Sequence, residues 1–272
     1  METVVIKVGG SVADDCEGLL SQIAERASGA EGTKIIIVHG GASKVTSVAQ
    51  KMGVGQKFVL SKEGFKSRFT DRETMRVFVM VTCGLINKSL VESLSKKGAK
   101  AFGLCGADGG LVRAKRKDVL VAFEDGKEKI LRGDYSGKIT SVDKGMLEGL
   151  LNAGMLPIIA PVALSAENEL VSLDADRLAA AVAKAIGAKR LLFFTDVDGF
   201  FWNFPDGFAA RIDGAAQIEE AIKAASAGMK KKILAAREAL SGPITEVIIA
   251  NARADGPLDN SLFGDRRTAI TL

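Results

Sequence analysis

The sequence predicts an α/β protein built on a mainly parallel β-sheet, and two observations carry this prediction. Apolar runs of four to eight residues alternate with stretches of helical periodicity along most of the 272 residues. The early and late runs are nearly continuous valine and isoleucine, which is typical of strands covered on both faces. With 47% hydrophobic residues, the chain is long enough to bury a large core, or two lobes that share a cleft.

The expected strands are short and lie at Val4–Val8, Lys34–Val38, Ala99–Leu104, Val119–Phe123, Leu156–Pro161, Arg190–Thr195, Thr245–Ala250 and Thr268–Leu272. Helices are expected between them, near Cys16–Ser28, Lys44–Met52, Arg72–Lys97, Val142–Ala153, Ala175–Ile186, Ala216–Ser226 and Met229–Leu240. Thr70-x-x-Glu73 has the form of a capping box at the start of the third helix, and Gly98 and Gly187 suit helix ends. Arg113–Phe123 and Glu124–Asp134 are expected to form a hairpin, because Asp125-Gly126 is a favoured turn pair.

Composition excludes several kinds of site. Because His39 is the one histidine, a multi-histidine metal site is excluded and Ser-His-Asp or Cys-His catalysis is disfavoured. The three cysteines (Cys16, Cys83 and Cys105) form no CxxC pair, which argues against a zinc ribbon or a disulfide framework. This cysteine usage favours a reducing, cytoplasmic compartment.

Composition also bears on partners. No unbroken apolar stretch approaches the ~20 residues that a membrane span requires, and the start of the chain has no signal-peptide pattern. A net charge of +4 is too small to indicate nucleic-acid binding by itself, and Trp202 and Tyr135 offer few stacking platforms for bases. We therefore expect neither a membrane nor a nucleic acid as the partner.

Two Gly-Gly turns follow two buried strands and precede two helices. Gly9-Gly10 ends the run VVIKV, in which Lys7 is the one charged residue, and Gly40-Gly41 follows His39 at the end of the run IIIV. Such turns expose backbone N–H groups at the carboxyl edge of a parallel sheet, where ligands of this fold class bind. The pair predicts adjacent anion sites, although each turn taken alone is equally explained as a tight connection.

Further motifs carry charged residues at expected helix starts or strand ends. Arg68 precedes the capped helix and suits bidentate capture of a carboxylate. Asp174 and Asp176 open an alanine-rich helix, where they fit either a helix cap or a site that holds lysines or magnesium. Lys230, Lys231 and Lys232 open another helix, where positive charge opposes the helix dipole unless an anion binds there.

Taken in this order, the motifs resemble the amino acid kinase family along essentially the whole chain, and within it the N-acetylglutamate kinase branch. The Ser-Arg-aromatic-Thr-Asp stretch at Ser67–Asp71, Gly137-Lys138, and the Asp174/Asp176 pair are most similar to kinases that phosphorylate aminoadipate or glutamate attached to the carrier protein LysW. The resemblance implies a three-layer αβα sandwich around a mainly parallel sheet. Residues 1–165 would form the lobe that binds the acyl acceptor, and residues 166–272 the lobe that binds ATP.

The resemblance also implies roles for individual residues. Lys7 and Lys232 would flank the transferred phosphoryl group, and Asp176 would hold both lysines. Gly9, Gly10, Gly40 and Gly41 would bring backbone N–H groups to the phosphates, with Gly40 and Gly41 also touching the acceptor. The remaining residues would contact the acceptor (Arg68 at its α-carboxylate, with Ser172 and Asp174) or the nucleotide (Thr195, Asp196, Val197, Asp198, Gly199 and Met229). Mg²⁺ would accompany ATP, and no protein residue is assigned as its ligand.

Phosphoryl transfer to a carboxylate suits this residue set, because a carboxylate is already a nucleophile and needs no general base. The acidic carrier would dock on the basic run Arg113–Lys117 together with Lys127, Lys129 and Arg132, although a solvated charged hairpin explains these residues as well. The helix Arg72–Lys97 would bury one side in the core and form a homodimer contact with the other. The alternatives are an N-acetylglutamate kinase of arginine biosynthesis and a non-catalytic metabolite-binding relative, and the choice between aminoadipate and glutamate is left open.

Overall fold

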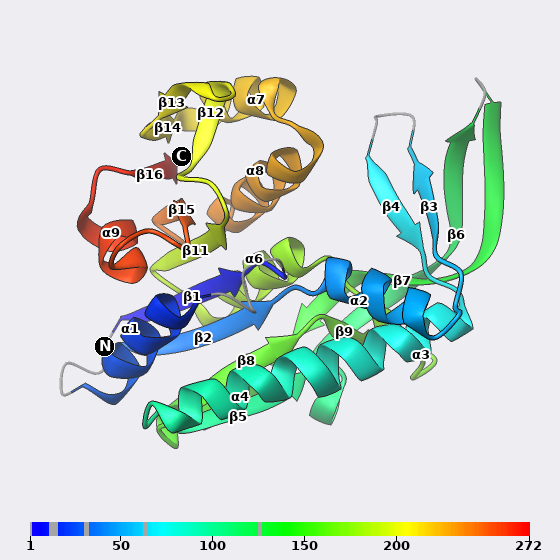
Figure 1. Cartoon of the computed structure of the whole chain (residues 1–272), viewed down its shortest axis with the longest axis horizontal. Helices are drawn as coiled ribbons and strands as arrows, with labels where there is room; N and C mark the ends of the chain where they lie inside the picture. Colours follow the sequence, from blue (N-terminus) through cyan, green and yellow to red (C-terminus); the bar gives the residue numbers. More distant parts are fainter. Residues whose placement is uncertain (1, 11–15, 30–32, 62–64, 125–126) are drawn as a thin grey trace.

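An eight-stranded sheet forms the centre of the protein (Figure 1). The computed structural model describes residues 2–10, 16–29, 33–61, 65–124 and 127–272. The strand order is β14-β16-β15-β11-β1-β2-β8-β5, and all pairs are parallel except β15 with β16. The strands are β1 (Thr3–Val8), β2 (Lys34–His39), β5 (Ala101–Cys105), β8 (Leu156–Ala160), β11 (Arg190–Thr195), β14 (Arg211–Asp213), β15 (Glu246–Asn251) and β16 (Arg267–Thr271).

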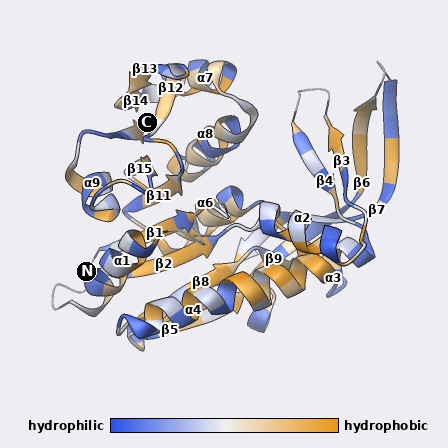
Figure 2. Cartoon of the chain, in the orientation of Figure 1, coloured by the Kyte–Doolittle hydropathy of each residue, from blue (hydrophilic) through white to orange (hydrophobic). Residues whose placement is uncertain are grey.

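Helices cover both faces of the sheet, which confirms the three-layer αβα prediction. One face packs against α5 (Lys144–Asn152), α6 (Ala175–Ile186), α7 (Gly214–Ala224) and α8 (Ala227–Leu240). The other packs against α1 (Glu17–Ser28), α2 (Ala42–Lys51), α3 (Arg72–Val79), α4 (Asn87–Lys96) and α9 (Pro257–Phe263). The apolar residues of β1 alternate between the two cores, with Val5 in the first and Val4, Ile6 and Val8 in the second. Figure 2 shows the hydrophobic strands between these layers.

The expected helix Arg72–Lys97 is present, with a π-helical segment (Met80–Ile86) between α3 and α4. Its 25 residues from Arg72 to Lys96 are long and apolar enough to cross a membrane by length and composition alone. However, Val77, Leu90 and Leu94 of this helix are buried in the core under the sheet. The helix is therefore explained as a core helix.

Two hairpins project side by side from one end of the molecule (Figure 1). The predicted hairpin is confirmed and is longer than expected, with β6 (Val112–Glu124) paired to β7 (Lys127–Val142); its predicted Asp125-Gly126 turn lies outside the described residues. Strands β6 and β7 close a small barrel with β9 (Val162–Leu164) and β10 (Leu170–Ser172). The second hairpin consists of β3 (Lys57–Leu60) and β4 (Lys66–Phe69).

Some local predictions are wrong or incomplete. Thr70 does not cap α3; Asp71 does, because its carboxylate accepts a hydrogen bond from the Thr74 amide at 2.8 Å. The helix expected from Val142 begins at Lys144, because Asp143 caps it. Sequence patterns missed the short elements β3, β4, β9, β10, β12 (Phe200–Asn203), β13 (Asp206–Ala209), β14 and α9, which are too short to show periodicity. The predicted lobe boundary at residue 165 falls between β9 and β10, and strands from both sides of it share one sheet.

Candidate active site

The two Gly-Gly turns meet where β1 and β2 end. These strands are parallel neighbours, with Val8 paired to His39, so Gly9-Gly10 and Gly40-Gly41 leave the sheet at the same edge. A Cβ atom added at Gly10 would lie 2.7 Å from the amide nitrogen of Gly41 and 2.8 Å from its Cα. The turns approach each other this closely because Gly10 has no side chain.

The junction offers two backbone donors. Within the described ranges, the amide N–H groups of Gly10 and Gly41 make no hydrogen bond to the protein, whereas the Gly40 amide donates to the Val8 carbonyl at 2.9 Å. The Gly9 amide donates to Phe194 O, at 3.3 Å. Two unused N–H groups at adjacent turns form a site suited to an anion.

A buried carboxylate holds two lysines beside this junction. Lys7 comes from β1, Asp176 from the first turn of α6, and Lys232 from α8. Lys7 Nζ lies 2.7 Å from Asp176 Oδ1, and Lys232 Nζ lies 3.4 Å from Asp176 Oδ2. Lys7 and Asp176 are buried, with side-chain exposures of 8% and 9%, and Lys232 is mostly buried, with 14%. The structure thus brings together three residues that the sequence separates by more than 50 positions each.

The charges of this triad determine its protonation. Burial alone would raise the pKa of Asp176, but the charges of Lys7 and Lys232 outweigh it, so the pKa lies below its usual value. Burial is the largest influence on Lys232 and lowers its pKa, although Asp176 opposes this shift. Two ammonium groups against one carboxylate leave excess positive charge, which suits a phosphate group between the lysines.

His39 is fully buried on the opposite face of the sheet from Lys7. Its Nδ1 lies 2.9 Å from the Gly40 carbonyl oxygen, and its Nε2 lies 3.3 Å from Nδ2 of Asn87 in α4. Burial is the main cause of a pKa lowered from 6.5 to about 4; the bond to Gly40 opposes this shift and the Lys7 charge adds to it. His39 is therefore neutral at physiological pH.

This buried histidine gives a testable dependence of stability on pH. Between pH 6.5 and about 4 the unfolded chain binds a proton that native His39 cannot, so the free energy of unfolding falls as the pH falls through this window. The expected loss is about 3 kcal/mol, measured by urea unfolding. In the variant His39→Asn this decrease should be absent, and an unchanged decrease would contradict the assignment. Asp176 contributes at lower pH, because its lowered pKa makes stability fall only below about 3.8.

Arg68, on β4, lies at the start of α2, next to the Gly40-Gly41 turn. Its guanidinium donates to the Ala42 carbonyl and the Thr46 hydroxyl, each at 2.9 Å, and to the Gln56 side chain. It also stacks 4.7 Å from the centre of the Phe58 ring, and burial lowers its pKa. Arg68 is therefore held in place beside the predicted acceptor site.

Ser172 and Asp174 have local structural partners. The Ser172 hydroxyl donates to the Tyr135 carbonyl at 3.4 Å, and Ser172 is buried at the end of β10 in the small barrel. Asp174 caps α6, because its carboxylate accepts hydrogen bonds from the amides of Asp176 and Arg177 at 3.0 and 3.1 Å. The cap orients the first turn of the helix that carries Asp176.

The predicted nucleotide residues follow β11. Asp198 accepts a hydrogen bond from Asn251 at 2.9 Å and pairs with Arg266 at 3.3 Å, and Thr195 Oγ1 donates to Asp196. A Cβ atom added at Gly199 would lie 3.0 Å from the Thr268 amide nitrogen. These contacts fix the turn at Thr195–Gly199, which includes Val197, at the same edge of the sheet as β1.

The lysines at the start of α8 contact two different parts of the protein. Lys232 points to Asp176, whereas Lys231 donates to the Lys66 carbonyl of the β3–β4 hairpin at 3.2 Å. Lys230 lies 5.1 Å from the Phe65 ring centre. Beside them, Met229 packs against the core. The start of α8 thus reaches from Asp176 to the β3–β4 hairpin.

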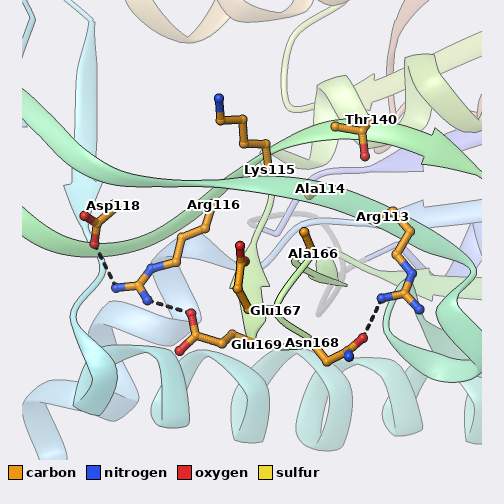
Figure 3. Close-up of a pocket in the computed structure, with 10 residues that line it drawn as sticks. All are labelled: Arg113, Ala114, Lys115, Arg116, Asp118, Thr140, Ala166, Glu167, Asn168 and Glu169. Carbon is orange, nitrogen blue, oxygen red and sulfur yellow. Dashed lines mark hydrogen bonds and ion pairs between the residues drawn. The ribbon is translucent and has the colours of Figure 1, made fainter.

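A separate cleft of about 890 Å³ opens between β6 and the β9–β10 turn (Figure 3). In it Arg116 pairs with Glu169 at 2.6 Å and with Asp118 at 3.2 Å, and Arg113 donates to Asn168 at 2.8 Å. Lys115 points away from these partners. None of the residues that line this cleft belongs to the Lys7–Asp176–Lys232 triad, so the cleft is separate from the triad.

Sequence reasoning missed several residues that build the site. Gln56 and Phe58 hold Arg68, and Asn251 holds Asp198, but their local sequence gives no signal. Asn87, in contrast, could have been found from the sequence, because a polar residue on the buried face of an apolar helix indicates a buried hydrogen-bond partner. Within the part of the chain that is described, no group of three or more His, Cys, Asp or Glu residues is suited to hold a metal.

Comparisons with known proteins match the whole chain. The family model described as "Amino acid kinase family" matches residues 2–251. A LysW-aminoadipate kinase of Deinococcus radiodurans is 41% identical over 263 residues, covering 96% of this chain and 89% of the relative. The LysW-aminoadipate kinase of Thermus thermophilus is 40% identical, with 96% and 98% covered. A LysW-aminoadipate/LysW-glutamate kinase of Metallosphaera sedula is 34% identical, with 98% and 100% covered.

Solved structures show the same fold at lower identity. N-acetylglutamate synthase from Neisseria gonorrhoeae, complexed with coenzyme A and N-acetyl-glutamate, superposes with a TM-score of 0.82 at 22% identity. All of this chain is covered, and it spans 59% of the synthase. Carbamate kinase from Giardia lamblia bound to AMP-PNP superposes with a TM-score of 0.70 at 16% identity, covering 99% of this chain and 98% of the kinase.

Proposed function

The chain belongs to the amino acid kinase family, and we propose that it is an ATP-dependent kinase of the side-chain carboxylate of aminoadipate or glutamate carried on a LysW-like protein. The family and the names of its full-length relatives support a kinase of amino-acid biosynthesis in the lysine or arginine branch. The product is an acyl phosphate. An N-acetylglutamate kinase is the alternative, because that acceptor carries the same carboxylate on a smaller group.

The observation that carries the proposal is the Lys7–Asp176–Lys232 triad beside two unused backbone amides. In the transfer, a carboxylate oxygen of the acceptor forms a bond to the γ-phosphorus while the bond from that phosphorus to the β–γ bridging oxygen breaks and ADP leaves. No proton has to be removed from the nucleophile, so positioning and charge compensation carry catalysis. The ammonium groups of Lys7 and Lys232 offset the charge on the phosphoryl oxygens, and the amides of Gly10 and Gly41 donate to them.

Residues around the triad supply the two substrate sites in this proposal. Arg68 binds the α-carboxylate of the acceptor from its place at the start of α2, and Ser172 also contacts the acceptor. The Thr195–Gly199 turn and Met229 contact the nucleotide. Mg²⁺ has no carboxylate cluster to hold it within the described residues, so we assign it to the nucleotide phosphates and derive no step from it.

The test is a comparison of acceptors with the purified protein. ADP release and hydroxylamine-trapped acyl phosphate are measured with carrier-linked aminoadipate, carrier-linked glutamate, N-acetylglutamate and free aminoadipate. We expect turnover only with the carrier-linked acids, and the ratio between the two decides the branch of biosynthesis. Turnover with N-acetylglutamate alone would refute the carrier-linked acceptor and establish the alternative.

We propose that the carrier docks on the basic edge of the β6–β7 hairpin. Lys115 and Lys117 are exposed and have no ion pair within the described ranges, whereas Arg116 is occupied by Glu169 and by stacking 3.6 Å from the Tyr135 ring centre. Exposed lysines without internal counter-charges attract an acidic partner. Of the predicted docking surface Arg113–Lys117, we therefore assign carrier binding to Lys115 and Lys117.

Charge reversal at this edge is expected to weaken carrier binding without affecting chemistry. The double variant Lys115→Glu/Lys117→Glu should raise KM for the carrier-linked acid about tenfold or more at low salt, and the difference should shrink in high salt. The matched control is Lys223→Glu, which reverses the charge of an exposed lysine on the distant helix α7. Equal KM values for the double variant and the control would place docking elsewhere.

Assembly and location complete the proposal. Met80 and Leu85, on the outer side of the helix Arg72–Lys96, are 50% and 47% exposed, and we propose that they lie in a homodimer interface. Analytical ultracentrifugation of the wild type and of Met80→Asp tests this proposal. We expect a dimeric wild type and a monomeric variant, and a monomeric wild type would contradict the proposal. Cys16, Cys83 and Cys105 form no disulfide bond with one another, which supports a cytoplasmic location.

A further inference from the structure

We propose that His39 and Asn87 act as positioning residues, which fix the orientation of the Gly40–Gly41 peptide so that the Gly41 N–H faces the transferred phosphoryl group. This inference deepens the proposed function and rests on it. Neither side chain touches a substrate. Both lie on the α4 side of the sheet, opposite Lys7 and Asp176.

The hydrogen bonds of His39 assign its proton to one nitrogen. The Gly40 carbonyl oxygen can only accept, so the ring nitrogen 2.9 Å from it, Nδ1, carries the hydrogen. In the neutral ring Nε2 is then an acceptor, and it faces the Nδ2 amide group of Asn87 at 3.3 Å. The chain of donation therefore runs from Asn87 to His39 to the Gly40 carbonyl.

Asn87 is itself fixed in one orientation. Its Nδ2 group also lies 2.8 Å from the Ile158 carbonyl oxygen and 3.3 Å from the Leu104 carbonyl oxygen, so one Nδ2 hydrogen bonds to Ile158 and the other is shared between Leu104 and His39 Nε2, which lie at equal distance. Its Oδ1 accepts from Lys88 Nζ at 3.2 Å. Because two backbone carbonyls require a donor at this position, the amide cannot rotate to present its oxygen to His39.

The planarity of the peptide bond carries this orientation to the active site. The Gly40–Gly41 bond is trans, so its C=O and N–H point in opposite directions. His39 draws the carbonyl toward α4, and the Gly41 N–H consequently points to the other side, where Lys7 and Lys232 lie. The Gly41 nitrogen lies 2.7 Å from where a Cβ of Gly10 would stand, so the two turns are adjacent and both unused amides can serve one anion.

The turn needs such a constraint because glycine stands on both sides of this peptide. Without a Cβ atom at either position, rotation of the peptide plane meets little steric resistance. A rotated peptide would turn a carbonyl oxygen, instead of an N–H group, toward the phosphate. The buried His39–Asn87 pair prevents this, which also gives a reason for a fully buried histidine that takes no part in proton transfer.

Three variants test the proposal in the full-length protein with the best acceptor of the wild type. His39→Leu removes the donor to Gly40 and should lower kcat about 100-fold with KM for ATP changed little, as for loss of an oxyanion-hole donor. His39→Asn places an amide donor near the Nδ1 position and should restore kcat to within about tenfold of the wild type. Ile37→Ala, a buried change on the same face of β2, controls for loss of stability and should leave kcat unchanged.

A spectroscopic measurement makes the test independent of turnover. Because His39 is the one histidine, ¹⁵N-labelled imidazole gives a single set of signals, expected to show a protonated Nδ1 and an unprotonated Nε2. In Asn87→Asp the carboxylate should accept from the ring and protonate Nε2. A wild type protonated at Nε2, or equal kcat values for His39→Leu and His39→Asn, would overturn the proposal. Absence of turnover with every acceptor would instead refute the proposed function, with the tautomer assignment still decided by the spectrum.

Discussion

Replacing Lys232 with alanine is expected to lower kcat by about 1000-fold while the protein stays folded. Lys232 supplies one of the two ammonium groups that converge on Asp176, and its Nζ lies 3.4 Å from that carboxylate. Its loss removes a charge that matters most when negative charge on the phosphoryl oxygens is redistributed in the transition state. Asp176 keeps Lys7 at 2.7 Å, so the buried carboxylate is still paired and the fold is retained.

The matched control for this variant is the neighbouring residue. Lys231→Ala removes the same side chain one position earlier, where the ammonium group donates to the Lys66 carbonyl on the hairpin. Its kcat should stay within about fivefold of the wild type, because a single exposed hydrogen bond contributes about 1 kcal/mol. Steady-state ADP release measures both variants, and circular dichroism confirms their fold. Undiminished turnover of Lys232→Ala would refute the role assigned to Lys232.

Replacing Asp176 with asparagine is expected to reduce both stability and activity. The substitution keeps the volume but leaves Lys7 and Lys232 buried, close together and without a counter-charge. Breaking a buried ion pair from one side costs about 3–5 kcal/mol, and the same order of loss is expected in the free energy of unfolding at pH 7. Turnover should fall as well, because the repelling lysines no longer hold one position around the phosphoryl group.

The cause of this loss can be separated from a simple packing defect. In the double variant Asp176→Asn/Lys7→Met one of the two uncompensated charges is removed, so stability should recover by about 1 kcal/mol or more, while activity should not. The free energy of unfolding is measured by urea denaturation. If the double variant is less stable than Asp176→Asn, charge repulsion does not explain the effect.

The central sheet and the residues at its strand ends could be predicted because they depend on local pattern. Continuous valine and isoleucine indicate buried parallel strands, and a Gly-Gly pair after such a strand indicates a backbone turned toward a ligand. Parallel strands end at a common edge, so the sequence pattern predicts that Gly10 and Gly41 lie close together. The structure adds the reason for glycine at Gly10, which is the 2.7 Å approach to the Gly41 nitrogen.

Other features could not be predicted because they depend on contacts between distant segments. Asn87 and His39 are 48 positions apart, and no local pattern pairs them. The same holds for Arg68 and Thr46, which meet only when the β3–β4 hairpin packs over α2. For Asp174 the local sequence is informative but allows two roles, a helix cap or a ligand. The structure shows that Asp174 caps α6. Basic residues on β6 likewise looked alike in sequence, but the structure pairs Arg116 internally and leaves Lys115 exposed.

The pairing of β1 with β11 has a consequence for how the protein matures on the ribosome. Lys7 is synthesised 169 residues before its counter-charge Asp176 and 225 residues before the second lysine, Lys232. At about 5–20 residues per second, many seconds pass between the synthesis of Lys7 and that of Asp176. Until then, burial of β1 between its neighbouring strands would bury the Lys7 ammonium group without a counter-charge, which is energetically costly. The Lys7–Asp176–Lys232 triad is therefore completed only after Lys232 has been synthesised, and a chain that stops before Asp176 leaves Lys7 without its counter-charge.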